Sequence, residues 1–202
     1  MDTVTTVLRK GAVGTGSRRH NSAVTKSFRL PKELAEVLAE DAQKKNLSVT
    51  DLLVSILTRY ALFDRNAEKF GFLTINRNSF KALIDIIPEE RIREAALVHS
   101  VGIGEFVEFW FKKKDLGSLL KAIDIVSKYL RSFEYTTSRS DHELTITMRT
   151  ELGKKFALFL GIAWEKGIAM ILGVAPRVDV EENQVNLTLA TGSLTSGPIF
   201  SQ

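Results

Sequence analysis

The chain has 202 residues, of which 44% are hydrophobic and 26% are charged, a composition typical of one large or two small globular domains. It contains no cysteine, which excludes a disulfide scaffold and any zinc site with cysteine ligands. Residues 1–70 carry 12 Lys and Arg against 8 Asp and Glu, whereas residues 71–202 carry 16 of each, so the net charge of +4 lies at one end. A basic end on a neutral protein suggests a polyanionic partner, although a solvated tail would have the same charge.

Residues 1–23 are rich in Gly, Ser, Thr and Arg and show no apolar period, which predicts a disordered basic arm. Residues 191–202 have a similar composition and are expected to form a disordered tail. The arm has no apolar segment long enough for a signal peptide. The most apolar window, 156–174, contains Glu165 and Lys166, so it predicts a buried helix and not a membrane span. We therefore expect a cytoplasmic protein with no membrane partner.

The segment from residue 24 to residue 31 has the pattern of a short strand with one apolar face. Phe28 and Leu30 alternate with Ser27 and Arg29, and this period of two predicts a strand over residues 24–30. Pro31 ends the strand and suits the start of a helix, where its missing N–H is not needed.

Two helices are predicted next. Apolar residues at helical spacing indicate a first helix over 32–45, and Asn46 suits a left-handed helix stop. Ser48 and Asp51 have the spacing of a capping box and predict the start of a second helix. The second helix continues toward a helical linker at 64–70. Its apolar stripe consists of Leu52, Leu53, Ile56, Leu57, Tyr60 and Ala61.

Residues 24–63 resemble the ribbon-helix-helix DNA-binding family of the Arc repressor type. The resemblance is carried by Ser-Phe-Arg-Leu-Pro at 27–31, the first helix, the turn at 46–48 and Asp-Leu-Leu at 51–53. In this family two chains each contribute one strand to an antiparallel ribbon that enters the DNA major groove. A strand and two short helices bury too little surface alone, which also favours a dimer. The resemblance implies a homodimeric transcription regulator, such as a repressor, that binds a palindromic operator sequence-specifically.

The resemblance also implies roles for individual residues. Thr25, Ser27 and Arg29 face outward from the strand and are expected to contact bases, since arginine can bond guanine and hydroxyls serve several base edges. The start of the second helix is expected to hold a phosphate with backbone N–H groups and the serine hydroxyl. The expected contacts to the DNA backbone are Lys26, Ser48, Val49, Thr50, Arg18 and Arg19. The expected dimer core is Phe28, Leu30, Leu34, Leu38, Leu52 and Ile56.

Residues 71–190 are expected to form an α+β domain in which helices pack on a mostly antiparallel sheet. The segment 143–160 resembles one found C-terminal to DNA-binding modules in some archaeal regulators, which implies a sensor, partner-binding or oligomerisation role with a small ligand or a protein. The predicted helices are 79–87, 88–98, 116–133 and 152–172, and the predicted strands are 72–75, 134–138, 143–149, 177–180 and 184–190.

The sequence offers no convergent set of catalytic or metal-binding residues. His20, His99 and His142 are too scattered for a metal site, and the glycines at 101–105 lack the third glycine of a nucleotide fingerprint. We expect neither an enzyme nor a cofactor. Lys112–Lys114 is interpreted as a solvated loop, or as an additional DNA-facing patch. The aromatic residues Phe106, Phe109, Trp110 and Phe111 predict a core helix turn, or else a ligand pocket or dimer contact.

An alternative function is that of an antitoxin-like protein, which binds DNA through its N-terminus and a protein partner through its C-terminal domain. A large exposed apolar patch on the C-terminal domain would favour this alternative. A closed cavity with a few polar groups would instead favour a ligand sensor.

Overall fold

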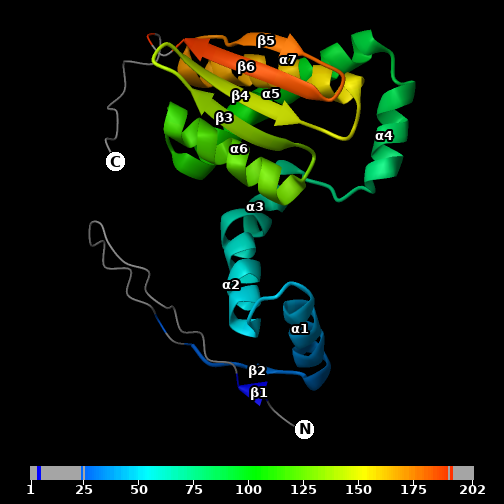
Figure 1. Cartoon of the computed structure of the whole chain (residues 1–202), viewed down its shortest axis with the longest axis vertical. Coiled ribbons are helices and arrows are strands. Elements are labelled where there is room, and N and C mark those ends of the chain that lie inside the picture. The colour runs from blue at the N-terminus through cyan, green and yellow to red at the C-terminus, as the bar shows by residue number, and fades with distance from the viewer. Residues whose placement is uncertain (1–3, 6–23, 25, 191, 193–202) are drawn as a thin grey trace. The chain divides into compact units, whose positions relative to one another are not determined.

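The computed structural model describes residues 4–5, 24, 26–190 and 192, and the chain divides into two compact units, Met1–Arg65 and Asn66–Gln202 (Figure 1). Apart from Val4–Thr5 and Gly192, the arm expected at 1–23 and the tail expected at 191–202 lie outside the described residues. Within the described part, no helix combines the length and the apolar character that crossing a membrane requires.

The N-terminal unit begins with two very short strands, β1 (Val4–Thr5) and β2 (Arg29–Leu30). They pair antiparallel, with Val4 opposite Leu30 and Thr5 opposite Arg29. The strand predicted over 24–30 is therefore shorter than expected, and residues 26–28 have no regular structure. A ladder forms only where a second strand lies opposite, and in the single chain β1 faces only two residues of this segment.

Two helices follow, and their ends confirm the local signals in the sequence. Helix α1 (Lys32–Lys44) begins directly after Pro31, and Asn46 adopts the left-handed conformation with φ 52°. Helix α2 (Val49–Arg59) has Ser48 as its N-cap, where the backbone N–H of Asp51 donates a hydrogen bond of 3.0 Å to the serine hydroxyl oxygen.

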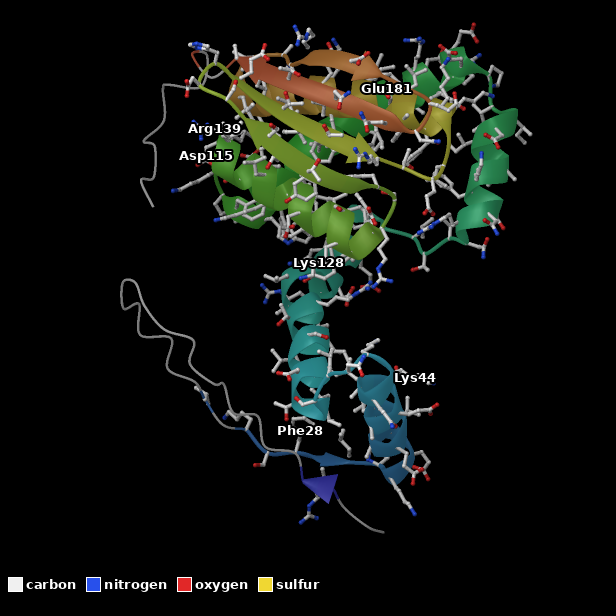
Figure 2. The ribbon with its side chains drawn as sticks, in the orientation of Figure 1. Phe28, Lys44, Asp115, Lys128, Arg139 and Glu181 are labelled. Atoms are coloured by element: carbon white, nitrogen blue, oxygen red, sulfur yellow. The ribbon has the colours of Figure 1, made fainter. Side chains whose placement is uncertain are left out.

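The N-terminal unit has a small apolar core between its two helices. The buried residues are Leu38, Ala42, Leu52 and Leu53. Phe28, Leu30 and Val49 pack against this core and are partly buried; Figure 2 labels Phe28 below α2 and beside α1. The inward side chains of the segment before α1 are thus the ones that the alternation predicted.

Helical turns continue beyond α2. They comprise a π-helical turn η1 (Tyr60–Asp64), α3 (Arg65–Ala67) and a 3₁₀ turn η2 (Glu68–Phe70). They end at Gly71, whose φ of 65° is the left-handed value that glycine adopts without strain. Helical structure therefore occupies the segment at 64–70 where a helical linker was expected.

The C-terminal unit is built on a four-stranded antiparallel sheet in the order β3-β4-β6-β5. The strands are β3 (Glu134–Arg139), β4 (Glu143–Arg149), β5 (Arg177–Val180) and β6 (Gln184–Ala190). They form two hairpins, as predicted, and β4 and β6 pair between them. The expected α+β class with an antiparallel sheet is confirmed.

Helix α7 (Lys154–Leu172) packs on one face of this sheet, and Figure 1 shows α7 and α5 behind the strands. Gly161 allows the close approach, because a Cβ there would lie 3.0 Å from Val180. The sheet side chains buried on this face are Leu144, Ile146, Met148, Val185, Leu187 and Leu189. The opposite face carries polar pairs such as Thr145 with Thr188, whose hydroxyl oxygens are 3.3 Å apart.

The longer helices of this unit also include α4 (Arg77–Ile86), α5 (Glu89–Phe111) and α6 (Leu116–Leu130). The strand expected at 72–75 is wrong, since these residues have no regular structure. The helix expected to end at Val98 continues to Phe111 through Gly102 and Gly104. Packing against α7 stabilises α5 across both glycines, and this tertiary contact overrides their low helix propensity.

Candidate functional site

The segment expected to read DNA has the alternation that the sequence predicts. Ser27 and Arg29 are exposed, whereas Phe28 and Leu30 are partly buried against the helices. Lys26 is also exposed. Thr25, Arg18 and Arg19, the other expected DNA contacts of this region, lie outside the described residues.

The start of α2 offers backbone N–H groups to an anion. The N–H groups of Val49 and Thr50 make no hydrogen bond within the described part of the chain. The Ser48 hydroxyl, however, donates to a carboxylate oxygen of Asp51 at 2.6 Å. Its proton is thus engaged, so a phosphate at this end would be held by the two amides and not by the serine hydroxyl.

The helices of the N-terminal unit expose an apolar face. Leu34 and Val37 of α1 are 45% and 54% exposed, and Ile56 and Leu57 of α2 are 45% and 48% exposed. The exposed large apolar residues of α1 and α2 are Leu34, Val37, Val54, Ile56 and Leu57. Several exposed large apolar residues on a small unit make these helices a candidate interaction surface.

The expected dimer core divides into two groups in the single chain. Leu38 and Leu52 are buried within it, and Phe28 and Leu30 are partly buried. Leu34 and Ile56 remain about half exposed, so only a second molecule or a distant part of the chain could bury them.

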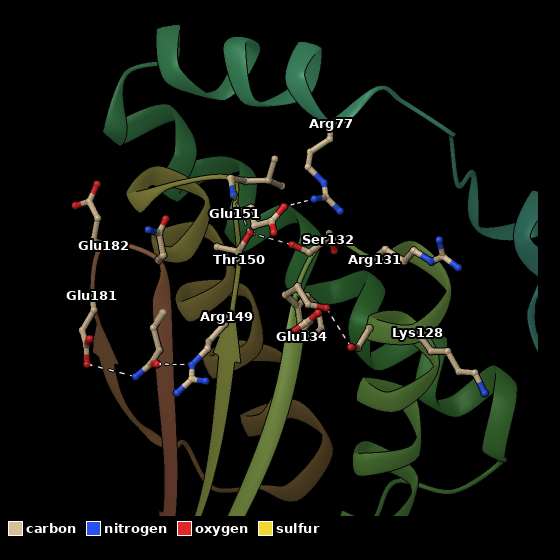
Figure 3. Close-up of a pocket in the computed structure, with 15 residues that line it drawn as sticks. Arg77, Lys128, Arg131, Ser132, Glu134, Arg149, Thr150, Glu151, Glu181 and Glu182 are labelled. Carbon is tan, nitrogen blue, oxygen red and sulfur yellow. Dashed lines mark hydrogen bonds and ion pairs between the residues drawn. The ribbon is translucent and has the colours of Figure 1, made fainter. Parts of the chain in front are cut away.

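The C-terminal unit contains an open pocket of about 830 Å³ that sequence reasoning did not find (Figure 3). It lies where the end of α6, the start of β3, the end of β4 and the β5–β6 turn meet. Its charged lining residues are the basic Arg77, Lys128, Arg131 and Arg149 and the acidic Glu134, Glu151, Glu181 and Glu182. Four positive and four negative charges give no net preference for an anion or a cation.

Several polar groups in this pocket already bond to one another. Arg77 forms an ion pair with Glu151, and the Arg149 Nε donates a 2.9 Å hydrogen bond to the side-chain oxygen of Gln184 (Figure 3). The Thr150 hydroxyl donates to the carbonyl of Ser132 at 2.9 Å. The pocket is therefore polar and open, unlike the closed cavity with a few polar groups that would indicate a ligand sensor.

Nothing in the described residues suggests a metal site. His99 lies in α5 and His142 in the β3–β4 turn, and no group of three potential ligands comes together among the residues described. His20 lies outside them. No residue or group in this part of the chain is assigned to a cofactor.

The aromatic residues near the end of α5 form a packed cluster. The Phe106 and Trp110 rings stack with centroids 4.1 Å apart, and Phe70 lies 5.0 Å from Trp110 and 5.2 Å from Phe109. Lys112, in the predicted solvated loop, places its amine 4.8 Å from the centre of the Phe109 ring. None of these residues lines the open pocket, and the cluster has the geometry of a helix turn packed on its neighbours.

Sequence reasoning also missed an exposed apolar face of α5. Leu97, Val98 and Val101 share helical spacing, but Val101 joins this face only if the helix is continued beyond Val98, where the expected helix ended.

The chain matches no protein-family model, no curated protein and no solved structure. The function therefore has to be argued from the residues and geometry of the two units.

Proposed function

We propose that the protein is a sequence-specific DNA-binding transcription regulator that acts as a homodimer. The β2 strands of two copies pair antiparallel and enter the major groove as a ribbon. One observation carries this proposal: polar Ser27 and Arg29 point outward, Phe28 and Leu30 point inward, and α1 and α2 expose apolar side chains next to the small core.

The exposed apolar face supports dimerisation by its size. Full burial of one aliphatic side chain contributes about 1.5–3 kcal/mol, so burying the exposed half of Leu34, Val37, Ile56 and Leu57 contributes about 3–6 kcal/mol per copy. Two copies gain about twice that free energy. The gain is comparable with the roughly 4–15 kcal/mol that association costs through the loss of translational and rotational freedom. The helices alone thus give a marginal dimer, and the strand pairing adds the remaining stability.

In the single chain, β1 occupies an edge of β2 with a ladder of only two residue pairs. In the proposed dimer the β2 strand of the second copy lies alongside β2 instead, and the ladder extends over residues 26–30. A longer ladder satisfies more backbone groups than β1 can. Exchange of β1 for the second strand is therefore favourable.

The outward residues have the chemistry that base readout needs. Arg29 can donate two hydrogen bonds to one guanine, and the Ser27 hydroxyl can donate or accept. Lys26 and the basic residues of the N-terminal arm add backbone contacts that weaken with salt. The Val49 and Thr50 amides supply a phosphate contact that fixes the position of the protein along the DNA duplex.

The test is selection from a pool of random duplex DNA with the purified full chain, over a series of salt concentrations. The wild type is expected to enrich a short palindrome, and Ser27→Ala/Arg29→Ala to keep only weak, strongly salt-dependent binding. Loss of one bidentate base contact costs about 1–3 kcal/mol in discrimination. A Lys44→Ala/Lys45→Ala control removes two exposed charges from the end of α1 and should leave the selected sequence unchanged. Equal enrichment by all three proteins, or by none, would contradict the proposal.

Dimerisation through the helices is tested separately by sedimentation. Ile56→Asp places a charge among the exposed apolar side chains of α2 and should raise the dissociation constant of the dimer without unfolding the chain, because Ile56 is already half exposed. The control is Leu73→Asp, at a residue of the C-terminal unit that is 87% exposed. An unchanged dissociation constant in the Ile56 variant would exclude these side chains from the dimer contact.

A second candidate function is the antitoxin-like protein with a protein partner on its C-terminal unit. It is favoured by Leu83 and Ile86, which lie three residues apart on α4 and are 50% and 77% exposed. A defined complex that dissociates on Ile86→Asp, with DNA binding retained, would support this candidate.

A further inference from the structure

Helix α5 has an apolar face on each side. Its inner side is buried and includes Ile103 and Val107. Its outer side carries Leu97, Val98 and Val101, which are 48%, 78% and 54% exposed. Spacings of one and four residues place these three side chains together on the helix surface, and a solvated helix face normally carries polar residues there.

Gly102 on the same outer side is unexplained by the single chain. Glycine inside a helix costs about 1 kcal/mol relative to alanine. Its φ is not positive, and a Cβ at this position would meet nothing within 4 Å among the described atoms. Gly167 of α7 differs, because its Cβ would lie 2.8 Å from Ile103. A glycine that faces open space beside exposed valines is what a closely approaching second helix requires.

Two opposite charges on this side of α5 lie at equal distances from Val98. Arg91 lies seven residues before Val98, and Glu105 lies seven residues after it, two helical turns in each direction. Arg91 bonds Glu94 at 2.6 Å, whereas Glu105 makes no ion pair with any residue in the range 26–190. If two α5 helices cross antiparallel beside Val98, each Arg91 meets the other Glu105, and each Gly102 lies opposite Glu94.

We propose that this outer face of α5 is a self-association surface on which the α5 helix of a second copy packs antiparallel, about a two-fold axis beside Val98. The occupant is a second copy because the charges complement themselves under a two-fold rotation, which is the requirement of an isologous interface. This surface lies on the C-terminal unit, whereas the proposed DNA-binding segment lies on the N-terminal unit. A homodimer formed by the N-terminal units would raise the local concentration of the second α5 and strengthen the contact.

Disulfide cross-linking of the full chain tests the contact directly. The protein has no cysteine, so Val98→Cys introduces a single thiol next to the proposed axis. Mild oxidation should convert this variant to a covalent dimer. The control is Lys121→Cys, at an exposed position of α6 in the same unit, which should remain largely monomeric. The Lys121→Cys control also measures the background cross-linking that would arise only because the N-terminal units hold two chains together.

Charge reversal tests the register. Arg91→Glu or Glu105→Arg alone should weaken self-association roughly tenfold, since each dimer contains two such contacts. The double variant Arg91→Glu/Glu105→Arg restores opposite charges and should recover it. Circular dichroism verifies that α5 is intact in each variant.

The Gly102→Leu substitution distinguishes an effect on self-association from an effect on folding stability. Its side chain points into open space in the single chain, so the unfolding midpoint at low protein concentration should rise, while cross-linking through Cys at position 98 should be lost. The proposal is overturned if Val98→Cys cross-links no more than Lys121→Cys, or if the double charge reversal fails to recover association. A Val98→Cys variant that stays monomeric would assign this face to a different occupant.

Discussion

Replacing Gly167 by alanine measures how tightly α7 packs on α5. The added Cβ would lie 2.8 Å from Ile103 Cγ2, 3.0 Å from its Cβ and 3.1 Å from its Cδ1. Carbon atoms in favourable contact are about 3.5–4.0 Å apart, so the whole isoleucine side chain has to move. Ile103 is only 6% exposed, and its surroundings leave it little space to do so.

The magnitude follows from two opposing effects. Alanine gains about 1 kcal/mol over glycine in helix propensity. Overpacking a core typically costs about 1–3 kcal/mol. Gly167→Ala is therefore expected to lower the free energy of unfolding by up to about 2 kcal/mol. Gly102→Ala is the matched control, because it has the same propensity gain but no atom within 4 Å, and it should raise the free energy of unfolding by about 0.5–1 kcal/mol.

The assay is urea unfolding followed by tryptophan fluorescence, at a protein concentration low enough to avoid self-association. Both tryptophans, Trp110 and Trp164, lie in the unit that contains the α5–α7 contact, so the signal reports the unfolding of that unit. A double-mutant cycle with Ile103→Ala assigns the cause, because removing the isoleucine branches should relieve the cost of Gly167→Ala by about 1 kcal/mol or more. If Gly167→Ala is as stable as Gly102→Ala, the close packing inferred here is wrong.

Further predictions concern helix caps and one tyrosine. Ser48→Ala should destabilise the N-terminal unit by about 1 kcal/mol in thermal unfolding followed by circular dichroism, whereas Ser48→Asn should be nearly neutral. The backbone N–H of Ser118, which donates a 2.7 Å hydrogen bond to Asp115, holds the pKa of that carboxyl below its usual value. The stabilisation of the folded state by the Asp115 carboxylate is present above the unfolded pKa of about 3.9 and is lost as the pH falls through the lower folded pKa. Asp115→Asn should keep the cap but lose this acid dependence, and unchanged acid unfolding would contradict it. Burial, with the charge of Asp124 and its hydrogen bond, raises the pKa of Tyr135. The contribution of the neutral Tyr135 side chain to folding stability is present below the unfolded pKa of about 10 and is lost as the pH rises through the higher folded pKa. In an ultraviolet titration Tyr135→Phe should remove the tyrosine that ionises at the higher pH, and loss of a normally titrating one would count against the assignment.

Helix ends and hairpins were predictable because their signals lie in consecutive residues. Pro31 before α1, Asn46 after it and Ser48 before α2 act on the backbone of their own turn. The two hairpins follow from strands joined by short polar turns, whose partners are adjacent in sequence.

The length of α5 and the open pocket depend on residues far apart in the chain. Gly102 and Gly104 are poor helix formers, and only packing against α7 carries the helix through them. The pocket brings Arg77, Arg131 and Glu181 together from three distant segments, and no local spacing encodes that meeting.

The amino-acid sequence by itself determined where the backbone turns and which side chains alternate, since propensity, capping and period act over a few residues. Only the tertiary structure decided which apolar residues the chain buries and which it leaves exposed. Leu38 and Leu34 both suit the inner face of α1, yet the first is 8% exposed and the second 45%. Burial depends on the neighbours that the fold supplies, and on those exposed side chains we base the proposed contacts with other molecules.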